Sequence, residues 1–118
     1  MNFHKQAKAI NKKLFSNKLN MGNVEIHYQK KLLINGNLIA GITMAFKTNK
    51  DERLSKIYLF SKYLKHMGKE FKINVLAHEM VHAYQNQLKQ KLNHNGAFFT
   101  YYERKARRFG YEIDMARF

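Results

Sequence analysis

The run His78-Glu79-Met80-Val81-His82 is the feature that most restricts the fold of this chain. Two histidines four residues apart lie one above the other on a helix, where both imidazoles can reach one metal ion. Glu79 follows the first histidine, where its carboxylate can take a proton from a metal-bound water rather than bind the ion. The run therefore predicts a helix that carries a metal site.

The residues around this run have the periodicity of a helix. Apolar side chains recur at the i, i+3, i+4, i+7 spacing of a buried stripe, which leaves His78 and His82 on a separate face. The helix is expected to span residues 69 to about 91. The predicted stripe consists of Ile73, Leu76, Ala77, Met80, Tyr84 and Leu88.

A catalytic zinc site usually has three protein ligands and a water, so a third ligand is expected downstream. His94 is the first candidate, because residues 93–96 (NHNG) predict a turn that can bring the chain back to the helix. Glu103 is the alternative, at a distance along the chain that suits a thermolysin-type site. A metzincin site is excluded, since it needs glycine and histidine where this chain has Gln85 and Leu88.

Two further helices are predicted on either side of the metal helix. The first spans residues 2 to about 19, with Phe3, Ala7, Ile10 and Leu14 as its buried face. The last runs from 97 to about 109. Its apolar face would consist of Phe98, Tyr102, Ala106 and Phe109.

Between the first helix and the metal helix, the pattern predicts strands. Residues 24–28 alternate apolar and polar, as in a half-buried strand. Asn35-Gly36-Asn37 indicates a hairpin turn to a second strand over residues 38–46, and a third strand is expected at 56–60. The expected fold is α+β: an N-terminal helix, a small three-stranded antiparallel sheet, the HExxH helix and a C-terminal helix, as one domain over residues 1–118.

Composition excludes several classes of protein. The chain has no cysteine, which rules out disulfides and thiolate metal sites and fits a reducing compartment. No apolar run approaches the length of a membrane span, and residues 1–13 have no apolar core of a secretory signal. We therefore expect a cytoplasmic protein that does not bind membranes.

The charge balance is strongly basic. Twenty-two Lys and Arg against eight Asp and Glu give a net charge of +14, which favours DNA or another polyanion as a partner. The most suggestive stretch mixes cations with the rings of Tyr101, Tyr102 and Tyr111, as single-strand binding surfaces do. The same stretch could also be the solvated face of the last helix. The candidate nucleic-acid contacts are Arg104, Lys105, Arg107 and Arg108.

The metal helix and the following turn resemble a known family. Residues 76–84 read Leu-Ala-His-Glu-Met-Val-His-Ala-Tyr, and residues 94–98 read His-Asn-Gly-Ala-Phe. Both stretches are similar to the SprT-like (Spartan-type) zinc metalloproteases. Residues 40–42 and 57–61 look like that family's strand pair. Many members also carry a cysteine zinc ribbon, which this cysteine-free chain cannot form.

The resemblance implies a zincin-like minimal protease. Zn²⁺ would be held by His78, His82 and His94, and Glu79 would be the catalytic acid/base. It also suggests protein substrates that are associated with DNA. Together with the residues themselves, this predicts a zinc-dependent metallopeptidase.

Two functions of other classes are compatible with the sequence. The chain could be a basic nucleic-acid-binding module with a structural metal site, closed by a fourth ligand such as Glu103. It could also be a non-catalytic effector that uses a protease-like fold to bind a protein partner, with Glu79 dispensable. Neither function requires a carboxylate beside the first histidine, so the metallopeptidase is the favoured prediction.

Overall fold

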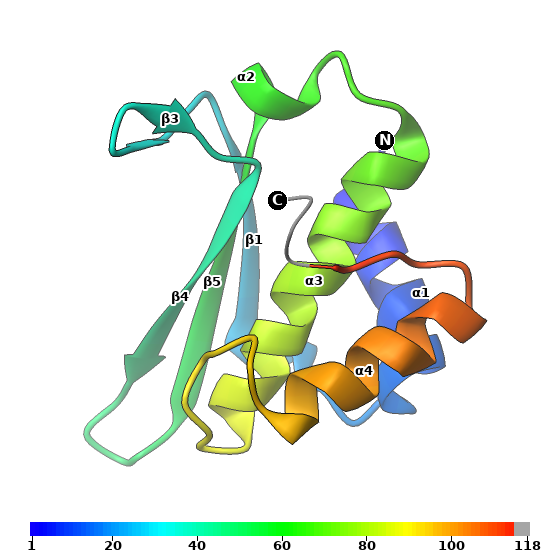
Figure 1. Cartoon of the computed structure of the whole chain (residues 1–118). Helices are drawn as coiled ribbons and strands as arrows, with labels where there is room; N and C mark the ends of the chain where they lie inside the picture. Colours follow the sequence, from blue (N-terminus) through cyan, green and yellow to red (C-terminus); the bar gives the residue numbers. More distant parts are fainter. Residues whose placement is uncertain (115–118) are drawn as a thin grey trace.

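The computed structural model describes residues 1–114 and has an α+β fold, as expected. Helices lie on one side of a small sheet (Figure 1). The metal helix α3 (Lys69–Gln87) packs against the sheet, and α1 (Phe3–Phe15) and α4 (Ala97–Arg108) pack against α3. The short helices η1 (Met21–Asn23) and α2 (Ser61–Leu64) flank the strands. One cluster of buried apolar side chains joins these elements.

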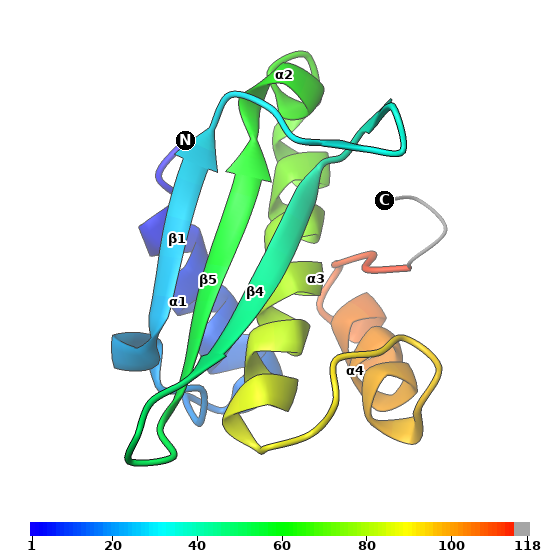
Figure 2. The ribbon, with the colours of Figure 1, turned by 90° about the vertical axis from the view of Figure 1, so that its left-hand side faces the viewer.

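The main sheet is mixed, so the prediction of a purely antiparallel sheet was wrong. Its strands are β1 (Val24–Gln29), β4 (Gly41–Lys47) and β5 (Arg53–Phe60), in the order β1-β5-β4. β5 pairs antiparallel with β4 and parallel with β1, as the arrows in Figure 2 show. β5 is the only one of the three with fully buried side chains, which explains its central position. It therefore separates β1 from β4.

The predicted turn at Asn35-Gly36 is present, but it does not join two strands of the main sheet. It connects β2 (Leu33–Ile34) to β3 (Asn37–Leu38) in a separate two-stranded ribbon. Asn35 and Gly36 have φ angles of 51° and 81°, the left-handed conformation that a two-residue turn of this type needs. The ribbon projects from the connection between β1 and β4.

Helix α1 buries the predicted face but ends earlier than expected. Phe3, Ala7, Ile10 and Leu14 are all buried. Ser16 and Asn17 adopt left-handed backbone conformations, which end the helix at Phe15. The buried Asn11 side chain then holds the following loop, because its Oδ1 accepts from Leu19 N–H and its Nδ2 donates to Leu19 O.

Helix α3 is buried on more sides than the single apolar face that the sequence predicted. Every residue from 75 to 86 is buried, because the sheet covers one side of the helix and α1 and α4 cover others. Leu88, which was predicted inside, is 45% exposed beyond the end of the helix. The histidines therefore lie in the interior rather than on an open face. No helix in residues 1–114 is both long and apolar enough to cross a membrane.

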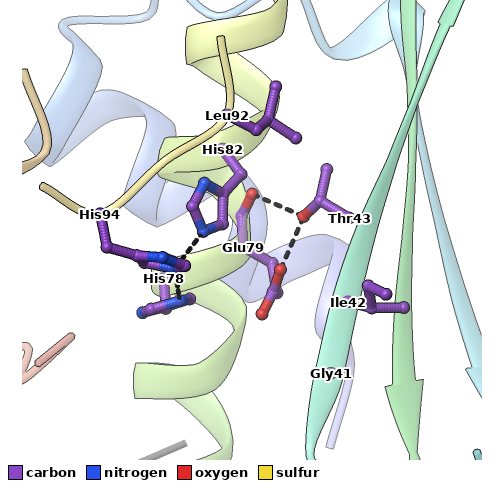
Figure 3. Close-up of a pocket in the computed structure, with 8 residues that line it drawn as sticks. All are labelled: Gly41, Ile42, Thr43, His78, Glu79, His82, Leu92 and His94. Atoms are coloured by element: carbon purple, nitrogen blue, oxygen red, sulfur yellow. Dashed lines mark hydrogen bonds between the residues drawn. The ribbon is translucent and has the colours of Figure 1, made fainter. Parts of the chain in front are cut away.

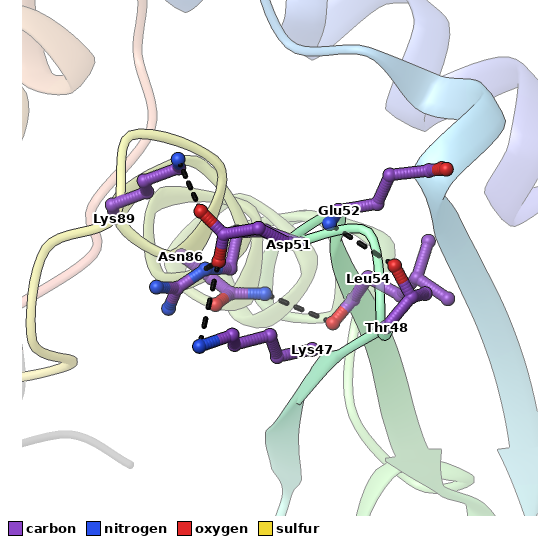
Figure 4. A network of polar contacts seen from close by, with 8 residues as sticks. Lys47, Thr48, Asp51, Glu52, Leu54, Asn86 and Lys89 are labelled. Atoms are coloured by element: carbon purple, nitrogen blue, oxygen red, sulfur yellow. Dashed lines mark hydrogen bonds and ion pairs between the residues drawn. The ribbon is translucent and has the colours of Figure 1, made fainter.

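A polar network attaches the β4–β5 turn to the C-terminal end of α3 (Figure 4). Asp51 in this turn pairs with Lys89 at 2.6 Å and with Lys47 at 3.6 Å. Below them, the buried Asn86 donates from Nδ2 to Leu54 O at 2.9 Å and to Ser55 Oγ at 3.0 Å. The end of the metal helix is thereby fixed to the start of the central strand.

Asn86→Ala should lower the free energy of unfolding by about 1–3 kcal/mol, because it leaves buried polar groups of β5 without a donor. Lys89→Ala is the matched control and should have a much smaller effect, since its ion pair is exposed. Urea denaturation of both variants, with a chelator present, measures the difference. Equal effects would contradict this account of the network.

Candidate metal centre

Helix α3 supplies the first three residues of the site. His78 and His82 lie one turn apart and are 3% and 6% exposed, and Glu79 between them is 5% exposed. The helix begins after Gly68 and continues without interruption through the motif. Figure 3 shows both imidazoles turned toward one point and the Glu79 side chain turned toward strand β4.

His94 comes from the loop after α3 and meets the two helical histidines. Its Nε2 lies 2.7 Å from His82 Nε2 and 3.2 Å from His78 Nε2. Zn–N bonds of about 2.0–2.1 Å in a tetrahedral site put ligand nitrogens roughly 3.3 Å apart. The three nitrogens are thus grouped at nearly the spacing of metal ligands. Among the described residues, these three histidines form a group that could hold a metal ion.

A backbone carbonyl orients His78. Its Nδ1 lies 2.8 Å from Ile113 O, which can only accept, so Nδ1–H is the donor and Nε2 is left to face the ion. The segment after α4 is held against α3 by a second bond, in which Glu112 N–H donates to Asn74 Oδ1. Ile113 itself is fully buried. His82 has a side-chain partner instead, with its Nδ1 2.8 Å from Gln85 Oε1.

Burial keeps the imidazoles neutral. It lowers the pKa of His78 to about 3 and that of His82 to about 4, although the bonds to Ile113 and Gln85 act in the opposite direction. The pKa of the half-buried His94 is lowered for the same reason. Neutral imidazole is the form that binds metals, so at pH 7 all three side chains are ready to bind an ion.

Glu79 points to the wall formed by β4. Burial raises its pKa to about 7, and the hydroxyl of Thr43, which donates to Oε1 at 2.7 Å, only partly offsets this. Gly41 permits the close approach of strand and helix: a Cβ there would lie 3.1 Å from both Val75 Cγ1 and Tyr58 O. The carboxylate and the three imidazoles line one pocket of about 300 Å³, together with Gly41, Ile42, Thr43 and Leu92.

Sequence reasoning missed Phe99, which packs against all three imidazoles. The centre of its ring lies 5.1, 5.2 and 5.0 Å from the rings of His78, His82 and His94. Its spacing of seven from Ala106, the other buried residue of α4, was the available signal. Phe98 is half-buried and packs against the core, as predicted, but the prediction that Phe109 packs inward was wrong, because Phe109 is exposed beyond the helix end.

The remaining predicted residues lie on α4, outside the pocket. Glu103 Oε1 accepts from Arg107 Nη2 at 3.0 Å and does not belong to the histidine group. Arg107 is also one of the four candidate nucleic-acid contacts. Of the other three, Arg104 and Arg108 are exposed. Lys105 is half-buried, with its Nζ 5.9 Å from the centre of the Tyr102 ring.

The chain was compared with models of known protein families and with curated proteins. The model of the SprT-like family matches residues 3–117, nearly the whole chain. No curated protein sequence matches this chain.

One metal ion per chain is the expected stoichiometry after purification with added Zn²⁺. His78→Ala, His82→Ala and His94→Ala should each lose most of it, because two imidazoles bind far more weakly than three. His27→Ala, which removes a histidine paired with Glu25 outside the site, and Glu103→Ala are the controls and should keep the metal. Elemental analysis after gel filtration tests this, and metal loss in Glu103→Ala with retention in His94→Ala would reverse the assignment.

Proposed function

The chain belongs to the SprT-like family, and on that basis we propose that it is a zinc-dependent metallopeptidase. The observation that carries the proposal is the convergence of three neutral imidazoles beside a buried carboxylate in one pocket. An all-imidazole donor set suits zinc. His78, His82 and His94 would hold the ion, which when bound supplies a Lewis acid and lowers the pKa of water to about 7.

Glu79 is the general acid/base in this proposal. Its carboxylate takes a proton from the attacking water and returns it to the leaving amine. Both steps need a group that can change protonation state, and burial raises the pKa of Glu79 toward neutral pH. Thr43 holds the carboxylate at the pocket wall through its bond to Oε1.

Strand β4 is the proposed docking edge for the substrate. It is an edge strand, paired only with β5 in the main sheet, and Gly41, Ile42 and Thr43 line the pocket. An extended peptide can add to such an edge through main-chain hydrogen bonds. A segment bound there would pass alongside Glu79 and the histidines.

The substrates are proposed to be proteins associated with DNA or another polyanion. The net charge of +14 attracts phosphates, and Arg104, Arg107 and Arg108 are exposed on α4. A nucleic acid bound by these cations would bring its attached proteins close to the pocket. The absence of cysteine fits a reducing compartment such as the cytoplasm.

The geometry gives less support to a structural metal site. Such sites usually have four protein ligands, and among the described residues the group has three. Glu103, the fourth ligand that this alternative would use, pairs with Arg107 instead. A purely protein-binding effector would have no use for a buried carboxylate at Glu79, whose burial is unfavourable.

Glu79→Gln should reduce peptide-bond cleavage by about 10²–10⁴-fold while the metal and the fold are retained, because an isosteric amide removes only the proton acceptor. Glu70→Gln removes the same charge from an exposed position on the same helix and should leave cleavage unchanged. Release of fluorescent fragments from casein, together with elemental analysis, measures both properties. Equal cleavage by the wild type and Glu79→Gln would show that the centre is not a hydrolase.

Binding to single-stranded DNA should weaken steeply as salt rises, because Lys and Arg displace counterions from phosphates. Changing Arg104, Lys105, Arg107 and Arg108 to Ala should reduce the slope of log K against log salt by up to roughly 3, at about 0.7 for each lost contact. The matched control changes the four exposed lysines of α1 to Ala: Lys5, Lys8, Lys12 and Lys13.

Fluorescence anisotropy at several salt concentrations gives these slopes. Equal losses in the two quadruple variants would mean that net charge, rather than the α4 face, determines binding. Affinity that does not depend on salt would remove the polyanion proposal.

A further inference from the structure

Gln85 is a buried amide in the last turns of α3, with 1% of its surface exposed. A buried amide requires hydrogen-bond partners, and Gln85 has two of different kinds. Its Nε2 donates to the backbone carbonyl of Asn93 at 3.0 Å, and its Oε1 lies 2.8 Å from His82 Nδ1.

These contacts determine which way the amide faces. The Asn93 carbonyl can only accept, so the NH₂ group of Gln85 must be on that side. Oε1 then faces His82 and can only accept, which requires a proton on His82 Nδ1. The lone pair of His82 is therefore on Nε2, the nitrogen that lies 2.7 Å from His94 Nε2.

The same residue holds the loop that carries His94. Asn93 immediately precedes His94, so the bond from Gln85 Nε2 fixes the backbone next to that side chain. At the start of the loop, the Gln85 carbonyl accepts from Gln90 N–H at 2.8 Å. Asn93 is also tied forward, since its Oδ1 accepts from Gly96 N–H at 3.3 Å.

We propose that Gln85 is a positioning residue of the metal centre. Its side-chain amide selects the tautomer of His82 and holds the loop of His94 against α3. One residue therefore orients two proposed metal ligands that come from different segments. The proposal rests on the metal site of the proposed function, and on no aspect of peptide cleavage. Loss of such an outer partner typically weakens metal binding by about 10–100-fold.

The chain contains a matched control in the same helix. Gln87 also bridges two backbone groups: its Oε1 accepts from Asn20 N–H at 2.7 Å, and its Nε2 donates to Lys18 O at 3.0 Å. These bonds attach α3 to the loop after α1, away from the histidines. Gln87→Leu thus removes the same chemistry as Gln85→Leu without a bond to a metal ligand or its loop.

Co²⁺ is the probe for affinity and geometry, because its visible absorption depends on the ligands and their arrangement. Gln85→Leu should bind Co²⁺ about 10–100-fold more weakly than the wild type and show an altered spectrum. Gln87→Leu should match the wild type in both. Equal affinity and spectra for Gln85→Leu and Gln87→Leu would overturn the proposal.

The tautomer of His82 is a second readout, which needs no metal. Long-range ¹H–¹⁵N spectra of the metal-free wild type should show the proton on Nδ1, and Gln85→Leu should move the population toward Nε2–H. A wild type that binds no Co²⁺ would refute the proposed function. The tautomer separately tests whether Gln85 orients His82, and a tautomer unchanged in Gln85→Leu would refute the positioning role.

Gln85→Glu separates the two bonds and replaces the Leu variant if that variant fails to fold. A carboxylate still accepts from His82 Nδ1–H but cannot donate to the Asn93 carbonyl. We expect the wild-type tautomer of His82, because the bond to Nδ1–H is kept. A shift of the proton toward Nε2 in this variant would overturn the assignment of the His82 tautomer to residue 85.

Discussion

Burial of the metal helix is the constraint on which the rest of the structure depends. Two imidazoles and a carboxylate removed from water must each find a partner, since an unsatisfied buried polar group is costly. Two partners come from distant parts of the chain, Thr43 on β4 and Ile113 after α4, and the third, Gln85, lies on the helix itself. The same burial lowers the pKa values of His78 and His82 and raises that of Glu79. Burial of α3 therefore accounts both for the hydrogen bonds of these side chains and for their shifted pKa values.

Local patterns in the sequence predicted the three long helices and the main strands, but not the short elements or the arrangement of the sheet. The buried face of α1 and the helix around the HExxH run follow from periodicity within one segment, and both are present. Strand order depends on how buried each strand is relative to the others. The sequence of one strand alone does not contain this information. The central place of β5, between β1 and β4, follows from its buried residues, such as Ile57 and Leu59, and produced a mixed sheet.

The residues of the candidate site also fall into those that a local pattern predicts and those that it does not. His78, Glu79 and His82 belong to one helical run and could be grouped from spacing alone, and the turn at residues 93–96 pointed to His94. Thr43 lies 36 positions before Glu79 and Ile113 lies 35 after His78, so no local pattern connects either pair. Phe99 had a weak signal in its helical spacing from Ala106.

The donor set explains why positioning matters in this protein. Three neutral imidazoles bring no negative charge to an incoming cation, and a chain with a net charge of +14 repels it at long range. Burial raises the pKa of Glu79, the acidic residue of the motif, and Asp114 acts electrostatically on His78. Metal affinity must then come chiefly from nitrogen lone pairs that already converge. The bonds that fix ring tautomer and direction are therefore expected to raise metal affinity, and in the proposed function Glu79 remains available for proton transfer.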